Sequence, residues 1–509
     1  KGMEERERTR KEVNNFFRIN AFTLKREALD FSTGILADFD KEKRRKWLEK
    51  LLDSIRKQSL PNCVIDLNVM KDAASEVSTA RQDSVPLLHI FSAFSVPRWN
   101  VTSDGSRILA APPGPTPEDA CVSQLTHCLR QRLLLVLQRA RRSRLLASEV
   151  VVPVEALLNG ASRPGITVLG VLSKITTEGF HVEDLTGSLP LEFGKKISFG
   201  EGVFTEGGCM LFKGDWDGTV LCVKEVSLVE PEPAEETRAV LGTVNWFGGS
   251  ERAAFAVCNR LRALEAKRHE ATIAILSDVH LDNAKTMEAV YHLLSGFSSC
   301  PPLAIIFCGD FCSSPLQPQT DRVLQKGFAH LAAQLRDFRT PFASTQFIIV
   351  PGSSDPSVPH ILPRPPLPPS LTGQLATMSN VTLATNPARI QYATQEIVVF
   401  RADTVERLCR EAIHVPPATQ LTDQVAATIV SNAHLSPLPQ WAYPVLWPAD
   451  VALRLHPLPD VLILADRFKA YQRRIAGCCV ANPGSFGPSA FDFFLYDASR
   501  RTMEESRIN

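Results

Sequence analysis

Short apolar runs that end in polar residues dominate the second half of the chain. Residues 273–276 have the length and β-branched character of a buried strand, and this run stops at Asp278-Val279-His280. A helix-length segment follows, and a second apolar run, 303–308, ends in Gly309-Asp310. The order strand, helix, strand predicts an open α/β sheet, whose sites form beyond the carboxyl ends of the strands. Similar strands are predicted at residues 346–350, 396–401, 461–464, 478–481 and 491–496.

The N-terminal segment carries the period of helices. One apolar stripe in residues 40–58 opposes a face rich in lysine and arginine, as in a helix packed on one side. The same pattern recurs in residues 22–39, 67–77 and 87–94. A small helical bundle is therefore predicted, with a basic face that is solvated or meets a partner.

A proline-rich linker and a basic helix are predicted next. Residues 97–118 lack periodicity, and residues 130–144 contain six arginines. Such a helix could contact phosphate or an acidic partner, or its basic face could be solvated. The candidates for a DNA or acidic-partner contact are Arg139, Arg141, Arg142 and Arg144.

Between residues 150 and 229 the pattern changes to short strands separated by turn signals. Five strands are predicted, at residues 166–172, 180–185, 189–193, 203–212 and 220–226. Closely spaced strands of this kind fit a small closed barrel. Few side chains are candidates for stacking on bases, chiefly Phe180, His181 and Trp216, so a packing barrel is favoured over one that reads DNA.

Composition and charge argue against a generally DNA-binding surface, a membrane span and a zinc site. Of the 509 residues, 44% are hydrophobic and 22% are charged, as in ordinary globular proteins, and the net charge is +1, so any DNA contact must be local. No apolar run approaches the ~18 residues of a membrane span, which predicts an intracellular protein with no membrane partner. The 12 cysteines are scattered without a C-x-x-C pair, which indicates reduced thiols rather than a zinc site.

The Asp-x-His and Gly-Asp blocks resemble the first two blocks of the calcineurin-like metallophosphoesterases. The resemblance implies that Asp278 and His280 bind one metal ion and that Asp310 bridges to a second, and such ions hold the oxygens of a phosphate ester. The family's third block is Gly-Asn-His followed by Asp or Glu, but this chain reads Gly352-Ser353-Ser354-Asp355.

The later blocks are also altered. The single histidine of the fourth block could survive as His434. The fifth block, Gly-His-x-His, reads Ala465-Asp466-Arg467-Phe468 and has lost both histidines. The resemblance therefore implies an inactivated phosphoesterase with no catalytic residue, no cofactor and no expected metal. Its vestigial positions are Asp278, His280, Asp310, Asp355, His434 and Asp466, and a single remaining ion would use Asp278, His280, Asp310 and His434.

Longer strings resemble a narrower family, the B subunits of eukaryotic DNA polymerase epsilon. They are FHVEDLTGSLPLEF (180–193), VNWFGG (244–249), ILPRPPLPPS (361–370), TNPARIQYATQEIVVFR (385–401), PDVLILAD (459–466) and NPGSF (482–486). This resemblance implies a multidomain α+β chain with a helical bundle, an OB-fold β-barrel and an inactivated calcineurin-like metallophosphoesterase α/β sandwich. The predicted domains are residues 1–96 (helical), 97–149 (linker and basic helix), 150–236 (OB-fold) and 237–509 (phosphoesterase-like).

The same resemblance implies a non-catalytic, nuclear subunit in chromosomal replication. Its expected partners are the C-terminal zinc-binding module of the polymerase epsilon catalytic subunit, the small histone-fold subunits of the complex and, through the N-terminal domain, the replicative helicase. DNA contact is expected to be weak or indirect. Two alternatives stay open: an active metal-dependent phosphodiesterase or 3′–5′ exonuclease, and a B subunit of another replicative polymerase.

Overall fold

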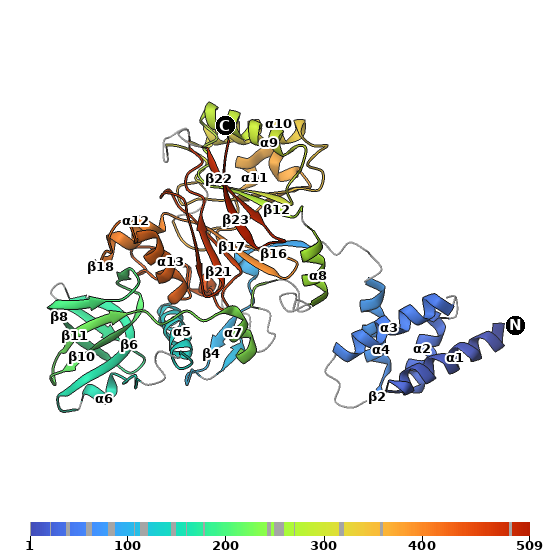
Figure 1. The fold of residues 1–509 in the computed structure, drawn as a ribbon, viewed down its shortest axis with the longest axis horizontal. Helices are drawn as coiled ribbons and strands as arrows, with labels where there is room; N and C mark the ends of the chain where they lie inside the picture. Colours follow the sequence, from blue (N-terminus) through green and yellow to red (C-terminus); the bar gives the residue numbers. More distant parts are fainter. Residues whose placement is uncertain are drawn as a thin grey trace. The chain divides into compact units, whose positions relative to one another are not determined.

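The computed structural model describes residues 2–20, 22–36, 41–57, 64–79, 87–105, 107–111, 121–143, 149–158, 160–176, 179–241, 246–248, 259–268, 270–314, 320–356, 360–487 and 491–508. The chain divides into two compact units, Lys1–Leu87 and Leu88–Asn509 (Figure 1). Among the described residues, no helix is both long and apolar enough to cross a membrane.

The first unit is a small helical domain with its own apolar core, as predicted. Its described elements are α1 (Gly2–Ile19), β1 (Thr23–Leu24), α2 (Arg26–Leu36), α3 (Lys41–Lys57), β2 (Val64–Ile65) and α4 (Leu67–Thr79). The apolar stripe of α3 is buried against α1, α2 and α4, and it consists of Trp47, Leu48, Leu51, Leu52 and Ile55. The two-residue strands β1 and β2 pair in parallel.

A closed five-stranded barrel confirms the predicted OB-fold class. Its strands are β6 (Arg163–Thr176), β7 (Gly179–Glu183), β8 (Ser188–Phe199), β10 (Cys209–Trp216) and β11 (Leu221–Ser227), in the order β10-β11-β8-β7-β6. The prediction of one strand over residues 203–212 is wrong. The turn at Gly207, with φ +81°, separates β10 from β9 (Phe204–Thr205), which leaves the barrel and pairs with β18 (Ala412–His414). Helix α6 (Glu155–Leu158) precedes β6.

The second unit also contains two six-stranded mixed sheets. The first sheet has the order β15 (Val381–Leu383), β14 (Gln346–Val350), β13 (Ala304–Cys308), β12 (Thr272–Leu276), β22 (Asp492–Asp497), β23 (Thr502–Arg507). The second has the order β20 (Tyr471–Ile475), β21 (Cys478–Asn482), β19 (Val461–Ala465), β17 (Gln395–Arg401), β16 (Ala388–Tyr392), β3 (Leu88–Phe91).

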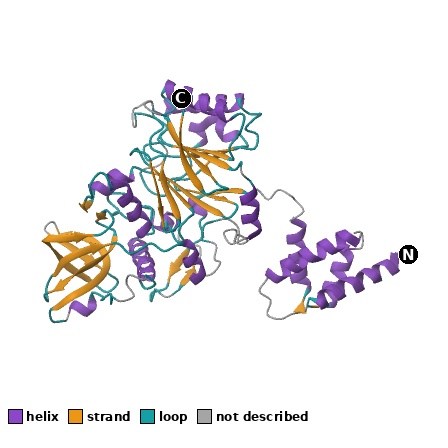
Figure 2. Ribbon diagram, viewed as in Figure 1, coloured by secondary structure: helices purple, strands orange, loops and turns teal. Residues whose placement is uncertain are grey.

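Helices cover one face of each sheet, which gives the expected α/β sandwich (Figure 2). Helices α9 (Ala284–Phe297), α10 (Thr320–Asp337) and α11 (Pro369–Thr372) and the 3₁₀ helix η4 (Gly373–Thr377) share a core with the first sheet. Helices α12 (Thr404–Arg410) and α13 (Leu421–Ser431) share a core with the second. Hydrogen bonds such as Tyr496 Oη to Gln395 Oε1, at 2.5 Å, join the two sheets.

Two sequence predictions near the start of this unit are wrong. The pattern of residues 87–94 predicts a helix of the N-terminal domain, but Leu88–Phe91 is strand β3, which pairs with β16 some 300 residues later in the sequence. The pattern of residues 97–118 predicts a linker, but β4 (Trp99–Val101) and β5 (Ile108–Ala110) form a hairpin. The ring of Trp99 drives this order, because it is 4% exposed and packs edge-on against Trp246 at 5.2 Å.

The elements between the barrel and the sandwich tie them together. They are η1 (Ala93–Ser95), α5 (Val122–Ala140), α7 (Ala234–Leu241), α8 (Asn259–Lys267) and η5 (Trp447–Leu453). The basic helix α5 packs against β4, β6 and η5 (Figure 1). Arg132 and Arg139 of this helix are therefore buried between other elements, whereas Arg130 is exposed.

Candidate functional site

A cluster of charged side chains lies where strands of both sheets end. Asp278 follows β12 and Asp310 follows β13, both in the first sheet. Arg401 is the last residue of β17, and Arg467 follows β19, both in the second sheet. The carboxyl ends of neighbouring parallel strands meet at one edge of a sheet, so Asp278 lies near Asp310 and Arg401 near Arg467. The packing of the two sheets then brings the two pairs together.

Asp278 is fully buried and bonded to an arginine from the opposite sheet. Its Oδ1 accepts hydrogen bonds from Arg401 Nη2 at 2.5 Å, from Arg401 Nε at 3.1 Å and from the backbone N–H of Asp310 at 3.1 Å. Its φ of +54° lies in the left-handed region, which is costly for a residue with a side chain and is held by the surrounding contacts.

Arg401 is itself completely buried and makes contacts with all three of its nitrogens. Besides Asp278, it reaches the Gly309 carbonyl at 2.6 Å, Asp403 Oδ1 at 2.8 Å and Asp310 Oδ2 at 3.3 Å. Burial alone would lower the pKa of Arg401, but the carboxylates of Asp278, Asp310 and Asp403 outweigh it and raise this pKa. The guanidinium is therefore charged at every physiological pH.

Asp310 is shared by two arginines. Its Oδ2 lies 2.6 Å from Arg467 Nη2, and its Oδ1 accepts from the backbone N–H of Ser354 at 2.9 Å. Burial opposes ionisation of this carboxyl, but Arg401, the Ser354 N–H and Arg467 hold its pKa below the ordinary value. Asp310 is therefore an ionised carboxylate held by cationic side chains.

Asp355, in the remnant of the third block, is a second buried carboxyl beside Asp310. It accepts from the backbone N–H groups of Phe311 at 2.8 Å and Gly352 at 2.7 Å. Burial and the neighbouring Asp310 raise the pKa of Asp355 to about 7. Glycine is required at 352, because a Cβ there would overlap Asp310 Oδ1.

Asp466 and His280 take no part in these ion pairs. Asp466, at a histidine position of the fifth block, accepts from the backbone N–H groups of Val405 and Phe468, both at 2.9 Å. Val405 lies in the first turn of α12, so Asp466 acts as an anchor for that helix terminus. The imidazole of His280 lies at the strand end next to Asp278 and is partly exposed.

His434 belongs to a different cluster. Its Nε2 lies 3.1 Å from Asp450 Oδ1, and its Nδ1 accepts from the backbone N–H of Ser436 at 3.0 Å. Asp450 also binds Arg132 of α5 at 2.6 Å and Arg454 at 2.9 Å. Burial and Arg132 lower the pKa of His434 to about 4, so this imidazole is neutral.

The residues present do not fit a metal centre. In the part of the chain that the structure describes, no group of three or more His, Cys, Asp or Glu side chains could hold a metal ion. The four candidates for a single remaining ion are not brought together, because His434 is engaged by Asp450 and the Oδ1 of Asp278 is engaged by Arg401. No hydrolytic step can therefore be derived through a metal here.

Three of the candidate arginines, in α5 and just after it, make contacts within the protein. Arg139 is 3% exposed and donates to the carbonyls of Val430 at 3.3 Å and Glu230 at 3.2 Å. Arg142 makes a two-bond pair with Glu232 at 2.6 and 2.7 Å, and Arg141 donates to the Asp104 carbonyl. A direct phosphate contact through Arg139 is not supported. Arg144 lies outside the described residues.

The residues that organise the cluster were missed by sequence reasoning. Arg401 and Asp403 end the predicted strand 396–401 and begin the next turn, where charged residues are usually solvated. One signal is present in the sequence: a buried arginine at the end of a largely apolar strand must find hydrogen-bond acceptors near the strand end. Which acceptors it finds depends on the packing of the two sheets.

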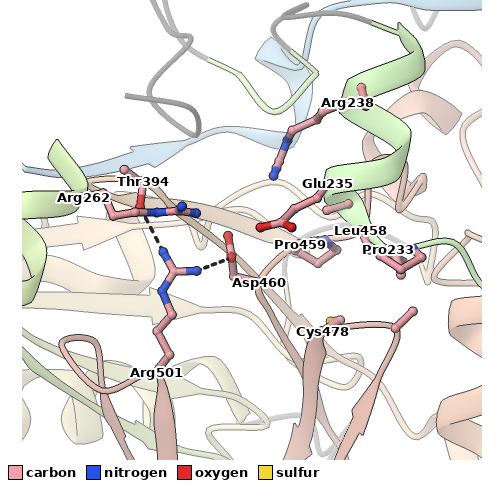
Figure 3. A pocket seen from close by; sticks show the side chains of 14 residues that line it. Pro233, Glu235, Arg238, Arg262, Thr394, Leu458, Pro459, Asp460, Cys478 and Arg501 are labelled. Carbon is pink, nitrogen blue, oxygen red and sulfur yellow. Dashed lines mark hydrogen bonds and ion pairs between the residues drawn. The ribbon is translucent and has the colours of Figure 1, made fainter. Parts of the chain in front are cut away.

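A hollow of about 600 Å³ lies at the opposite end of strands β17 and β19 from the charged cluster (Figure 3). It is bounded by the first turns of α7, by Asp460 just before β19 and by the turn before β17. Arg501 lines this hollow, and its guanidinium donates hydrogen bonds to Thr394 at 3.0 Å and to Asp460 at 2.9 Å. Arg501 and Arg238, two of the three arginines that line the hollow, have carboxylate partners.

Three family models match separate parts of the chain. They describe the DNA polymerases epsilon N terminal (residues 5–77), the DNA polymerase epsilon subunit 2-like OB-fold domain (122–230) and the DNA polymerase alpha/epsilon B subunit (273–473). A solved archaeal phosphodiesterase matches with 13% identity and a TM-score of 0.26, covering 47% of this chain and 99% of its own. A likeness of that size carries no conclusion about chemistry.

Relatives match over nearly the whole length. A probable DNA polymerase epsilon subunit 2 of Caenorhabditis elegans is 39% identical over 504 residues, which cover 98% of this chain and 94% of the relative. The DNA polymerase epsilon subunit 2 of Homo sapiens is 31% identical over 527 residues, covering 99% of both chains. Because this similarity extends over nearly the whole chain and the family models match its barrel and its sandwich, the chain belongs to the family of DNA polymerase epsilon subunit 2, also called the B subunit.

Proposed function

We propose that this chain is a non-catalytic accessory subunit of the nuclear DNA polymerase epsilon complex and acts in chromosomal replication. Family membership over nearly the full length supports the complex. One observation carries the non-catalytic part: the carboxylates that would bind metal are bonded to Arg401 and Arg467 instead. These ion pairs neutralise the carboxylates that a metal ion would need as ligands.

The proposed main partner is the C-terminal zinc-binding module of the catalytic subunit, held across the barrel and the sandwich. This role needs a platform that does not flex between the two. Buried hydrogen bonds join the barrel side to the sandwich: Val203 N–H donates to Thr428 Oγ1 at 2.7 Å, and Cys209 N–H donates to Asn432 Oδ1 at 2.8 Å. Strands β9 and β18 add a backbone link between them.

The remaining partners belong to the same proposal. The helical unit would join the complex to the replicative helicase, and the small histone-fold subunits would bind elsewhere in the assembly. We keep the predicted division into residues 1–96, 97–149, 150–236 and 237–509 as a proposal, with strand β3 moved into the last part. Contact with DNA would be weak or indirect, since Arg139 and Arg142 are engaged internally.

Co-expression tests the proposal. The full chain is produced with a tagged C-terminal half of the polymerase epsilon catalytic subunit, and parallel cultures carry the matching halves from polymerases alpha and delta. We expect stoichiometric co-purification with the epsilon partner alone. Equal capture by alpha or delta would favour a B subunit of another polymerase, and no capture by any would refute the proposal.

A second candidate function is kept because Asp278, His280 and Asp310 retain the first two phosphoesterase blocks in order. It is a metal-dependent phosphodiesterase or 3′–5′ exonuclease. For this activity a metal would have to displace Arg401 from Asp278, which would leave a buried guanidinium without its partner.

A further inference from the structure

The charge balance at the strand ends leads to one inference about Arg401. Asp278 and Asp310 are both 0% exposed and come from neighbouring strands of one sheet. Two carboxylates buried this close need a cation between them. We infer that Arg401 is a built-in cation: its guanidinium takes the place that a divalent metal would take and clasps the two sheets together. This inference deepens the proposed function and rests on its non-catalytic part.

All three nitrogens of the Arg401 guanidinium donate hydrogen bonds. Nε and Nη2 both point to Asp278 Oδ1, Nη2 also reaches Asp310, and Nη1 is bonded to Asp403. A planar fork of donors suits several carboxylates at once, which a lysine ammonium would not match. The contacts explain why this position is an arginine at the end of an apolar strand.

A second arginine completes the balance at the rim. Arg467 lies 2.6 Å from Asp310 and 3.8 Å from Asp403, and its side chain is 48% exposed. The guanidinium charges of Arg401 and Arg467 thus face three carboxylates, those of Asp278, Asp310 and Asp403. Solvent reaches only Arg467 and Asp403. A divalent ion entering this group would meet two positive charges before it met a free carboxylate oxygen.

The clasp joins elements that are far apart in the sequence. Arg401 ends β17 of the second sheet, while Asp278 and Asp310 follow β12 and β13 of the first. Asn386 reinforces it: its Nδ2 donates to the carbonyls of Arg401 at 2.7 Å and Pro351 at 2.9 Å. Because Pro351 follows β14, this amide also connects the two sheets.

The test measures the thermal unfolding of the full chain with and without manganese or EDTA. We expect the wild-type Tm to be unchanged by either. Arg401→Met keeps the length but removes the charge, and should lower Tm on the order of 10 °C, with part of this loss recovered by manganese. The matched control is Arg410→Met, which removes an exposed arginine paired with Glu406 and should leave Tm and its manganese response unchanged.

A second variant covers the case in which Arg401→Met does not fold. Asp278→Asn with Arg401→Met removes both charges, so it should fold better than Arg401→Met alone and show no manganese response. If neither variant folds, Arg401 acts through its shape, and the inference is overturned. It is also overturned if manganese raises the wild-type Tm, or if Arg401→Met shows no manganese response or behaves like Arg410→Met.

The outcomes separate this inference from the proposed function. A wild-type chain that binds manganese and still co-purifies with the catalytic subunit overturns the built-in cation alone. A chain that ignores manganese but fails to bind the catalytic subunit overturns the proposed partner and leaves the role of Arg401 standing.

Discussion

Asp450 shows how much a single buried carboxylate can hold. It accepts from Arg132 at 2.6 Å, from Arg454 at 2.9 Å and from His434 at 3.1 Å, and it is 2% exposed. Asp450→Asn would leave two arginines buried without a counter-charge, so we expect a loss of about 3–5 kcal/mol in the free energy of unfolding. Urea denaturation measures it, and the exposed Glu406→Gln should cost no more than about 1 kcal/mol. Equal effects of the two substitutions would contradict the role of Asp450.

Asp355 predicts a specific dependence of stability on pH. Its pKa in the folded protein is raised to about 7 from an ordinary 3.8, by burial and by Asp310. The folded state therefore binds more protons than the unfolded state between these values, and this contribution to stability is full below about pH 4 and lost as pH rises through about 7.

The comparison with Asp355→Asn isolates this contribution. The unfolding free energy of the wild type relative to the variant should rise as pH falls from about 7 toward 4. Chemical denaturation at a series of pH values measures the difference. A flat or opposite trend would show that Asp355 is not a buried acid with a raised pKa.

At the residue scale the sequence pointed to the right carboxylates but not to their partners. Asp278, Asp310 and Asp466 could be placed at strand ends because apolar runs stop just before them. Arg401 could not be assigned to Asp278, since the two residues meet only when two sheets pack. His434 was placed by motif order alone, and the structure engages it with Asp450 instead.

Strand β3 marks where the second unit begins. It pairs with β16 through Ile90 opposite Ile390, and Phe91 packs edge-on against Phe247 at 6.3 Å. Two truncated chains test its role: residues 88–509 should melt like the sandwich of the full chain, while residues 97–509 should melt at a lower temperature. The second truncation exposes the backbone edge of β16, which also favours aggregation. Equal Tm values for the two would contradict the assignment of β3.

Elements with a strong local period were predictable, and elements defined by distant partners were not. The helix predicted within residues 40–58 is observed as α3, because its apolar stripe repeats with the helical period. Strand β3 is only four residues long, and its partner lies far away in the sequence, so its short apolar run suggested a helix. The hairpin of β4 and β5 was hidden in the same way by the prolines around it.

The basic helix α5 illustrates the same limit in its charges. Its arginines suggested an exposed basic face, whereas Arg132 and Arg139 are buried against the sandwich. Desolvation by burial lowers the pKa of Arg139 to about 10, which reflects a guanidinium held by carbonyls rather than by a carboxylate. The helix therefore packs between the barrel and the sandwich and connects them.

For the whole molecule, family, fold and site lead to one picture. In the two-sheet sandwich, Arg401 and Arg467 are paired with buried carboxylates, and the barrel and α5 are fixed to the sandwich by buried hydrogen bonds and ion pairs. The division at Leu87 sets a helical unit with its own core apart from this platform.

The decisive measurement for the non-catalytic role is the hydrolysis of a chromogenic phosphodiester by the purified full chain, with manganese supplied. We expect the same background rate for the wild type and for Asp310→Ala, because Asp310 is bound to arginines rather than to a metal. A manganese-dependent rate that Asp310→Ala abolishes would contradict it.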